Sequence, residues 1–149
     1  MGFTFRFASL LRFAEHEEDA VKQRLAIKDG QISAEEASIR KLQGELDVAV
    51  DGQSKALVAG NMDFIRLYPA YIRRLDKTRE FHEDEIGRLR QQREKILVEL
   101  AEKRRVRRIY EKLRERDEKR YIKAELKRDQ KRMDDFAGRS RSSFPDSQG

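Results

Sequence analysis

Several residue types are missing or rare in this chain of 149 residues. Cysteine and tryptophan are absent, and there are only two prolines. Without cysteine the chain can form neither disulfides nor thiolate metal sites, so a reducing compartment is compatible with it. The sequence contains no run of about eighteen apolar residues, so we expect no membrane-spanning helix. The apolar N-terminal stretch is interrupted by Arg6 and Arg12, which is not typical of a secretory signal. We therefore predict a cytoplasmic protein.

Charge is what the chain has in abundance. Charged residues make up 42% of it and hydrophobic residues 38%. This composition leaves too few apolar residues for a thick globular core, but it suits helices that bury a narrow stripe. The net charge of +6 is concentrated, because residues 88–132 hold 19 basic and 9 acidic groups, a local net charge of +10.

A heptad pattern occupies the first third of the sequence. Alternating steps of four and three residues connect thirteen positions from Phe7 to Ala49, and ten of these positions are apolar. The exceptions are Glu18, Lys28 and Glu35. This spacing is typical of a coiled-coil seam, and it predicts a helix over about residues 5–50.

Turn signals follow the first helix. Asp51-Gly52 and Gly60-Asn61 favour turns, and Pro69 is tolerated in the first turn of a helix. We therefore predict a connection over residues 51–68, with a short helix near residues 54–59, and a second helix over residues 69–136. Beyond Leu100, the positions of Val106, Ile109, Tyr110 and Leu113 indicate a shift of heptad phase, or stutter. The last segment, 138–149, is small and polar, and we expect it to be a disordered tail.

The predicted fold is all-α, an antiparallel two-helix coiled-coil hairpin forming a single domain over residues 1–137. With a turn near residue 60, Phe7 lies beside Leu113, and the longer C-terminal helix continues without an intramolecular partner. We call this segment, Lys119–Phe136, the overhang. It is basic and weakly amphipathic, which favours a docking role.

Catalytic chemistry is not indicated. The sequence has no phosphate-binding G-x-x-x-x-G-K-[ST] loop, and His16 and His82 are not paired in any metal-ligand spacing. A two-helix rod also lacks a cleft that excludes water. We expect no enzyme activity, no cofactor and no bound metal.

Three groups of residues have both a structural and a functional interpretation. Tyr71, Leu75, Thr78 and His82 share one face of the second helix, which is either the internal seam or a patch for a partner. The phenylalanines Phe3, Phe5, Phe7 and Phe13 pack as a staple at the chain start or bind a partner. The arginines Arg104, Arg105, Arg107 and Arg108 form a solvated face or an electrostatic binding surface.

Three segments resemble one known family. They are FRFASLLRFAEHEEDAVKQRLA (residues 5–26), YPAYIRRLDKTREFH (residues 68–82) and DQKRMDDFAGR (residues 129–139). In this order they resemble the FliJ family, the coiled-coil component of the bacterial flagellar type III export apparatus. The ending Met133-Asp134-Asp135-Phe136-Ala137 is the most specific of them.

The resemblance implies a stalk-like hairpin similar to the central stalk of rotary ATPases. It implies three partners: the export ATPase hexamer, the cytoplasmic domain of the export gate, and export chaperones. The positions that correspond to gate binding are Tyr71, Leu75, Thr78 and His82. For the ATPase ring we expect contacts from the chain start and the overhang, namely Phe5, Phe7, Leu11, Arg120, Tyr121, Lys127, Arg128, Lys131, Met133 and Phe136.

The expected location is the cytoplasmic side of the cell membrane, peripheral and without membrane insertion, and we expect a monomer when free. The equivalent stalk of an injection-type secretion system has the same fold and is the main alternative. A basic coiled coil that binds nucleic acid is less favoured, because acidic residues such as Glu111 and Glu115 are interleaved with the cations and would repel phosphates. For this reason we expect no nucleic-acid partner. A membrane-scaffold protein is a further alternative.

Overall fold

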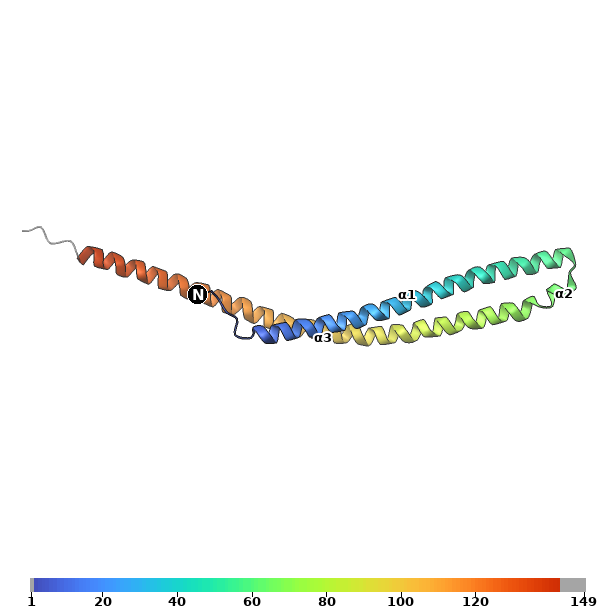
Figure 1. The fold of residues 1–149 in the computed structure, drawn as a ribbon, viewed down its shortest axis with the longest axis horizontal. Coiled ribbons are helices and arrows are strands. Elements are labelled where there is room, and N and C mark those ends of the chain that lie inside the picture. Colours follow the sequence, from blue (N-terminus) through green and yellow to red (C-terminus); the bar gives the residue numbers. More distant parts are fainter. Residues whose placement is uncertain (1, 143–149) are drawn as a thin grey trace, which may run out of the picture. The chain divides into compact units, whose positions relative to one another are not determined.

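Two long helices connected by a short one make up the fold. The computed structural model describes residues 2–142, in which α1 spans Ala8–Ala59, α2 spans Met62–Ile65 and α3 spans Tyr68–Ser142. The helices α1 and α3 run side by side in opposite directions, with α2 in the connection (Figure 1). The described residues include no strand. The predicted antiparallel hairpin with a longer C-terminal helix is therefore confirmed.

Contacts divide the chain into two units, and both long helices pass through each of them. The turn unit comprises Glu18–Glu102, and the open-end unit comprises Met1–Glu17 together with Lys103–Gly149. The assignment of residues 1–137 to a single domain stays a prediction.

The seam of α1 lies where the heptads place it. All thirteen predicted positions from Phe7 to Ala49 are buried or half-buried. In the turn unit, Val21 packs with Ile96 and Leu100, and a second cluster joins Leu46, Ala49 and Leu75. In the open-end unit the buried apolar residues are Phe5, Leu11 and Ala14. The core is thus a chain of small clusters between two helices, as expected for a composition this polar.

The seam also contains charged side chains. Glu18 is only 2% exposed, and its carboxylate lies 3.4 Å from the Lys22 ammonium. A carboxylate this deeply buried is tolerated when a cation partly compensates for its lost hydration.

The predicted stutter in α3 stays a prediction, because Val106 and Leu113 are half-buried whereas Arg114, the next position on the regular spacing after Tyr110, is exposed. Within the turn unit, positions 72, 75, 79, 82, 86, 89, 93, 96 and 100 are buried or half-buried, and within the open-end unit the same spacing continues through 103, 107 and 110. Arg79, Arg93, Lys103 and Arg107 occupy seam positions in this uninterrupted pattern. Long basic side chains can cover apolar surface with their methylene stems while the charge stays near water. A pattern that counts only apolar residues therefore misses them.

Ion pairs between the helices set the register. In the turn unit Arg24 pairs with Glu99 at 2.9 Å and Arg93 pairs with Asp29 at 2.6 Å. In the open-end unit Lys103 pairs with Glu17 at 2.8 Å. In each pair the two partners are almost equally far along the chain from residue 61. This agrees with the turn predicted near residue 60.

The first helix is longer than predicted, because Asp51-Gly52 does not form a turn. The helix α1 continues to Ala59, so the expected short helix near residues 54–59 is its last part and the connection shrinks to residues 60–67. Lys55 stabilises this segment through an i,i+4 pair with Asp51 at 3.0 Å. Gly52 serves close packing instead, since a Cβ at this position would lie 2.7 Å from the Tyr68 hydroxyl.

Gly60 is where α1 stops. Its φ of +70° is in the left-handed region, and no other described glycine has a positive φ. The Gly60 N–H donates to the Leu57 carbonyl at 3.3 Å, and the Asn61 N–H donates to the Ala56 carbonyl at 3.1 Å. These two bonds form a Schellman cap, which is favourable when glycine occupies the left-handed position.

The other helix ends also differ from the prediction. The helix α1 begins at Ala8 rather than near residue 5, since residues 2–5 have no regular secondary structure and Arg6 and Phe7 form a turn. The helix α3 continues past residue 136 to Ser142, so residues 138–142 are helical and not a disordered tail. The rest of the expected tail, 143–149, lies outside the described residues.

The core cluster around Leu100 predicts a specific loss of stability. Leu100→Ala removes a side chain that is 4% exposed and should lower the free energy of unfolding by about 2–4 kcal/mol. Val98→Ala alters a neighbouring side chain that is 72% exposed and should change it by less than about 0.5 kcal/mol. Urea denaturation followed by circular dichroism measures both. Equal effects would contradict the seam assignment.

The Schellman cap predicts opposite effects of two glycine substitutions. Gly60→Ala should lower the free energy of unfolding by about 1 kcal/mol, because alanine is strained at a positive φ. Gly44→Ala should raise it by up to about 1 kcal/mol, because Gly44 lies inside α1 and a Cβ there meets nothing within 4 Å. Thermal unfolding of the two variants tests this, and a stabilising Gly60→Ala would refute the cap.

Candidate partner-binding sites

The residues predicted to bind partners lie in both units of the hairpin. In the turn unit, the four residues predicted for gate binding fall into two pairs. Leu75 is buried in the cluster with Leu46 and Ala49. His82 is half-buried, and its Nδ1 forms a hydrogen bond with the Glu35 carboxylate of α1. Leu75 and His82 therefore belong to the internal seam.

The other two residues of this set are exposed. The Tyr71 side chain is 44% exposed, and the Thr78 hydroxyl donates to the Arg74 carbonyl at 2.9 Å within its own helix. The turn predicted at Asp51-Gly52 does not interrupt α1, since this helix passes through residue 52 without a break. Only Tyr71 and Thr78 of the four can touch a partner while the hairpin stays closed.

A groove beside Tyr71 enlarges this face. It has a volume of about 700 Å³, and α1 contributes Gly44, Val48 and Gly52 to it while α3 contributes Tyr68 and Tyr71. The absence of a side chain at Gly44 leaves the α1 backbone open to close approach, whereas Gly52 is covered by the Tyr68 side chain. Lys41 and Glu45 add one charge of each sign at the rim. The groove is therefore apolar, bounded by two tyrosines, and nearly neutral.

In the open-end unit, the aromatic residues at the chain start pack against the protein itself. The rings of Phe5 and Phe7 meet edge to face with centroids 5.9 Å apart, and the Arg6 guanidinium lies 5.1 Å from the Phe7 ring centre. The ring of Phe3 packs against the ring of Tyr121 in α3, with the two ring centroids 5.7 Å apart. The staple interpretation thus accounts for these three phenylalanines, whereas Phe13 is exposed.

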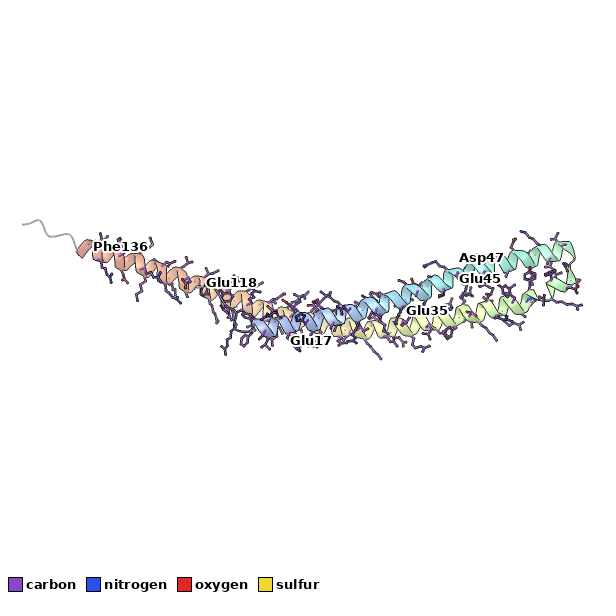
Figure 2. All side chains as sticks on the ribbon, in the orientation of Figure 1. Glu17, Glu35, Glu45, Asp47, Glu118 and Phe136 are labelled. Carbon is purple, nitrogen blue, oxygen red and sulfur yellow. The ribbon has the colours of Figure 1, made fainter. Side chains whose placement is uncertain are left out.

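The residues expected to contact the ATPase ring therefore differ in how exposed their side chains are. Phe5 and Leu11 are buried, and Phe7 and Tyr121 are half-buried. Every residue from Leu126 to Phe136 is exposed, and Arg120 is exposed as well. Figure 2 shows side chains projecting from the single helix between Glu118 and Phe136.

The overhang has two distinct faces. Ile122, Leu126, Met133 and Phe136 follow one another at steps of four, seven and three, which places them in one stripe. At about 100° per residue, Arg120, Lys127 and Lys131 lie on the opposite side, with Arg128 at the flank. The expected ring contacts therefore surround the helix, with apolar anchors on one side and cations on the other.

Sequence reasoning missed the α1 half of the turn-unit groove. Val48 is 73% exposed and lies one position before the seam residue Ala49. A large apolar residue outside the heptad seam, flanked at four residues on each side by glycine, is a signal that could have identified it.

Comparison with known proteins decides the family. The protein-family model described as "Flagellar FliJ protein" matches residues 3–143. The chain belongs to the FliJ family.

Membership establishes a coiled-coil protein related to flagellar export, and members of the FliJ family are export components rather than known enzymes. Searches of curated proteins and of solved structures give no significant match. Among the described residues, no helix is long and apolar enough to cross a bilayer, and no group of three potential metal ligands occurs.

Proposed function

We propose that this protein is the stalk-like component of a flagellar export apparatus, and that it couples the export ATPase to secretion of flagellar subunits and hence to motility. The family match over residues 3–143 is the observation that carries this proposal. A hairpin with one helix extending beyond its partner supports it, because it offers a different binding surface in each unit.

The overhang is the proposed contact for the hexameric ATPase. Met133 and Phe136 are about three-quarters exposed and supply apolar anchors. The cations on the opposite side, Lys127 and Lys131 among them, supply electrostatic attraction that favours fast association. A single helix inside a ring makes a different contact with each subunit. Many shallow contacts around the helix suit this arrangement better than one deep pocket would.

The groove at the turn unit is the proposed contact for the cytoplasmic domain of the export gate. Tyr71, Tyr68 and Val48 give it the aromatic and apolar character of a binding hot spot. Leu75 and His82 hold α3 against α1 and so keep the groove in shape. Their effect on gate binding is therefore indirect. Thr78 extends the exposed side of this face.

Export chaperones complete the set of proposed partners on the strength of the family alone. Binding to a membrane-embedded gate would place the protein at the cytoplasmic face of the membrane. The same geometry serves the stalk of an injection-type secretion system, and the neighbouring genes distinguish the two.

The exposed anchors of the overhang predict how the ATPase responds. The double variant Met133→Asp, Phe136→Asp should raise the concentration needed for half-maximal stimulation of the purified export ATPase by at least about tenfold. The reason is that each substitution replaces an apolar contact with a charged side chain that prefers water. The measurement is ATP hydrolysis as the protein is titrated.

The matched control is Ile27→Asp with Val98→Asp, two exposed positions in the turn unit, which should leave stimulation unchanged. Point changes are preferable to truncation after Leu113, because truncation would also remove Tyr121 and its contact with Phe3. Stimulation that survives the overhang double variant would disprove this contact.

The groove at Val48 predicts the gate response. Val48→Asp should weaken binding to the purified cytoplasmic domain of the gate by at least about tenfold, because the substitution puts a charge into an apolar contact. Val98→Asp, at a valine of equal exposure (72% against 73%), should bind like the unaltered protein. Isothermal titration calorimetry measures both affinities, and indistinguishable values would place the gate contact elsewhere.

A further inference from the structure

The connection between the two long helices differs sharply in composition from the rest of the chain. Between residues 56 and 72 only Asp63 and Arg66 are charged, whereas 42% of all residues in the chain are charged. Five large apolar side chains in this stretch are exposed, namely Leu57, Val58, Met62, Phe64 and Leu67. We call these five residues the apolar tip.

The apolar tip makes no contribution to the two core clusters of the turn unit. Val58 is 92% exposed, and the other four residues are more than half exposed. Single exposed apolar residues are common on protein surfaces, but five within eleven residues form a patch of the kind that marks a binding surface.

Much of the backbone at the turn is satisfied internally. Within residues 60–71, six N–H groups donate to backbone carbonyls, those of Gly60, Asn61, Ile65, Arg66, Leu67 and Tyr71. Unpaired backbone groups are the main cost of bringing a turn into an apolar medium. The Schellman cap and the single turn of α2 reduce that cost here.

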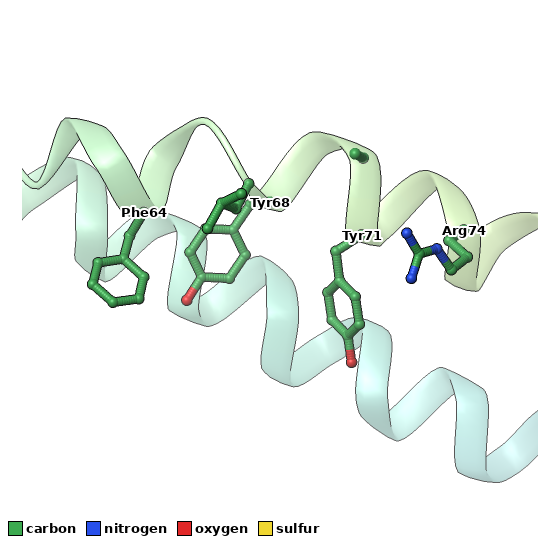
Figure 3. A pocket seen from close by; sticks show the side chains of 6 residues that line it. Phe64, Tyr68, Tyr71 and Arg74 are labelled. Atoms are coloured by element: carbon green, nitrogen blue, oxygen red, sulfur yellow. The ribbon is translucent and has the colours of Figure 1, made fainter.

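Residues next to the apolar tip change in polarity in a definite order. Tyr68 and Tyr71 come first along α3 and project from the same side of the α2–α3 segment as Phe64 (Figure 3). Arg73 and Arg74 follow on the next turn. Apolar residues followed by tyrosine and then arginine match the succession from acyl chains through the interface to the phosphates of a bilayer.

We propose that the apolar tip inserts shallowly into the surface of a lipid bilayer, with Tyr68 and Tyr71 at the headgroup level and Arg73 and Arg74 near the phosphates. A protein interface normally has a polar rim with hydrogen bonds. With Asp63 and Arg66 as its only charged residues, the tip has few side chains that could form such a rim, which favours a bilayer over a protein partner. Shallow insertion modifies the sequence-based expectation of no membrane insertion, and it is distinct from spanning the bilayer.

The absence of tryptophan makes a direct test possible. The full chain carrying Phe64→Trp has one tryptophan, whose emission should shift to the blue on mixing with phosphatidylcholine vesicles and should be quenched by brominated acyl chains. Binding should persist at about 0.5 M NaCl, because burial of apolar surface is not screened by salt.

Two aspartate variants in this tryptophan background locate the contact. Val58→Asp should weaken the partition into vesicles by at least about tenfold, because a carboxylate is costly in the acyl region. It should not unfold the protein, since Val58 touches little of it, and circular dichroism checks this. Val98→Asp, at an exposed valine in the middle of α3, should partition like the parent.

Several results would overturn the proposal. One is the absence of a blue shift with any vesicle. Another is vesicle binding that requires the anionic lipid phosphatidylglycerol, is lost at about 0.5 M NaCl and is unchanged by Val58→Asp. Such binding would be due to the Lys and Arg side chains of the chain and not to the apolar tip. A blue shift at high protein concentration without lipid would indicate a second copy. In a separate measurement without vesicles, a shift caused only by the purified gate domain would indicate a protein partner. Since no gate or ATPase enters the vesicle assay, its failure would leave the proposed function untouched.

Discussion

Two helices held together by a narrow seam are the constraint on which everything else in this protein depends. Each turn contributes about one side chain to the contact, so the free energy of association is spread along the helices in small clusters such as Val21, Ile96 and Leu100. The remaining side chains of each helix stay available for charge. This division leaves the surface free for partner contacts.

Charged residues within the seam show how register is specified in a core so thin. A stripe of leucine alone would allow two antiparallel helices to slide by a heptad, because each heptad is similar to the next. Arg79, Arg93 and Lys103 remove this degeneracy, since a shifted helix would separate them from Gln43, Asp29 and Glu17 of the other helix. Specificity is obtained at some expense of apolar contact area, as in other coiled coils with polar seam residues.

The sequence predicts the hairpin and its register because periodic patterns of apolar residues are strong local signals. It also predicts that the overhang has no partner from Lys119 onward, but Tyr121 contacts Phe3 of the chain start. It predicts the ends of the helices poorly. Asp51-Gly52 and Gly60-Asn61 carry similar turn signals, and the folded chain separates them, because Tyr68 packs against Gly52 whereas Gly60 has a positive φ. The binding faces are predicted in part. Helical spacing groups Tyr71, Leu75, Thr78 and His82 correctly on one face, but it cannot show that Leu75 and His82 are covered by α1, nor that Val48 and Tyr71 border one groove.

The overhang carries its own ion pairs, Glu125 with Arg128 at 2.9 Å and Asp129 with Arg132 at 3.8 Å. Pairs at this spacing favour the helical state even where no neighbouring helix covers the segment. A recognition element that is already helical loses less conformational entropy on capture than a disordered peptide of the same sequence. In the proposed contact with the ATPase ring, no folding step would then limit the rate of binding and release.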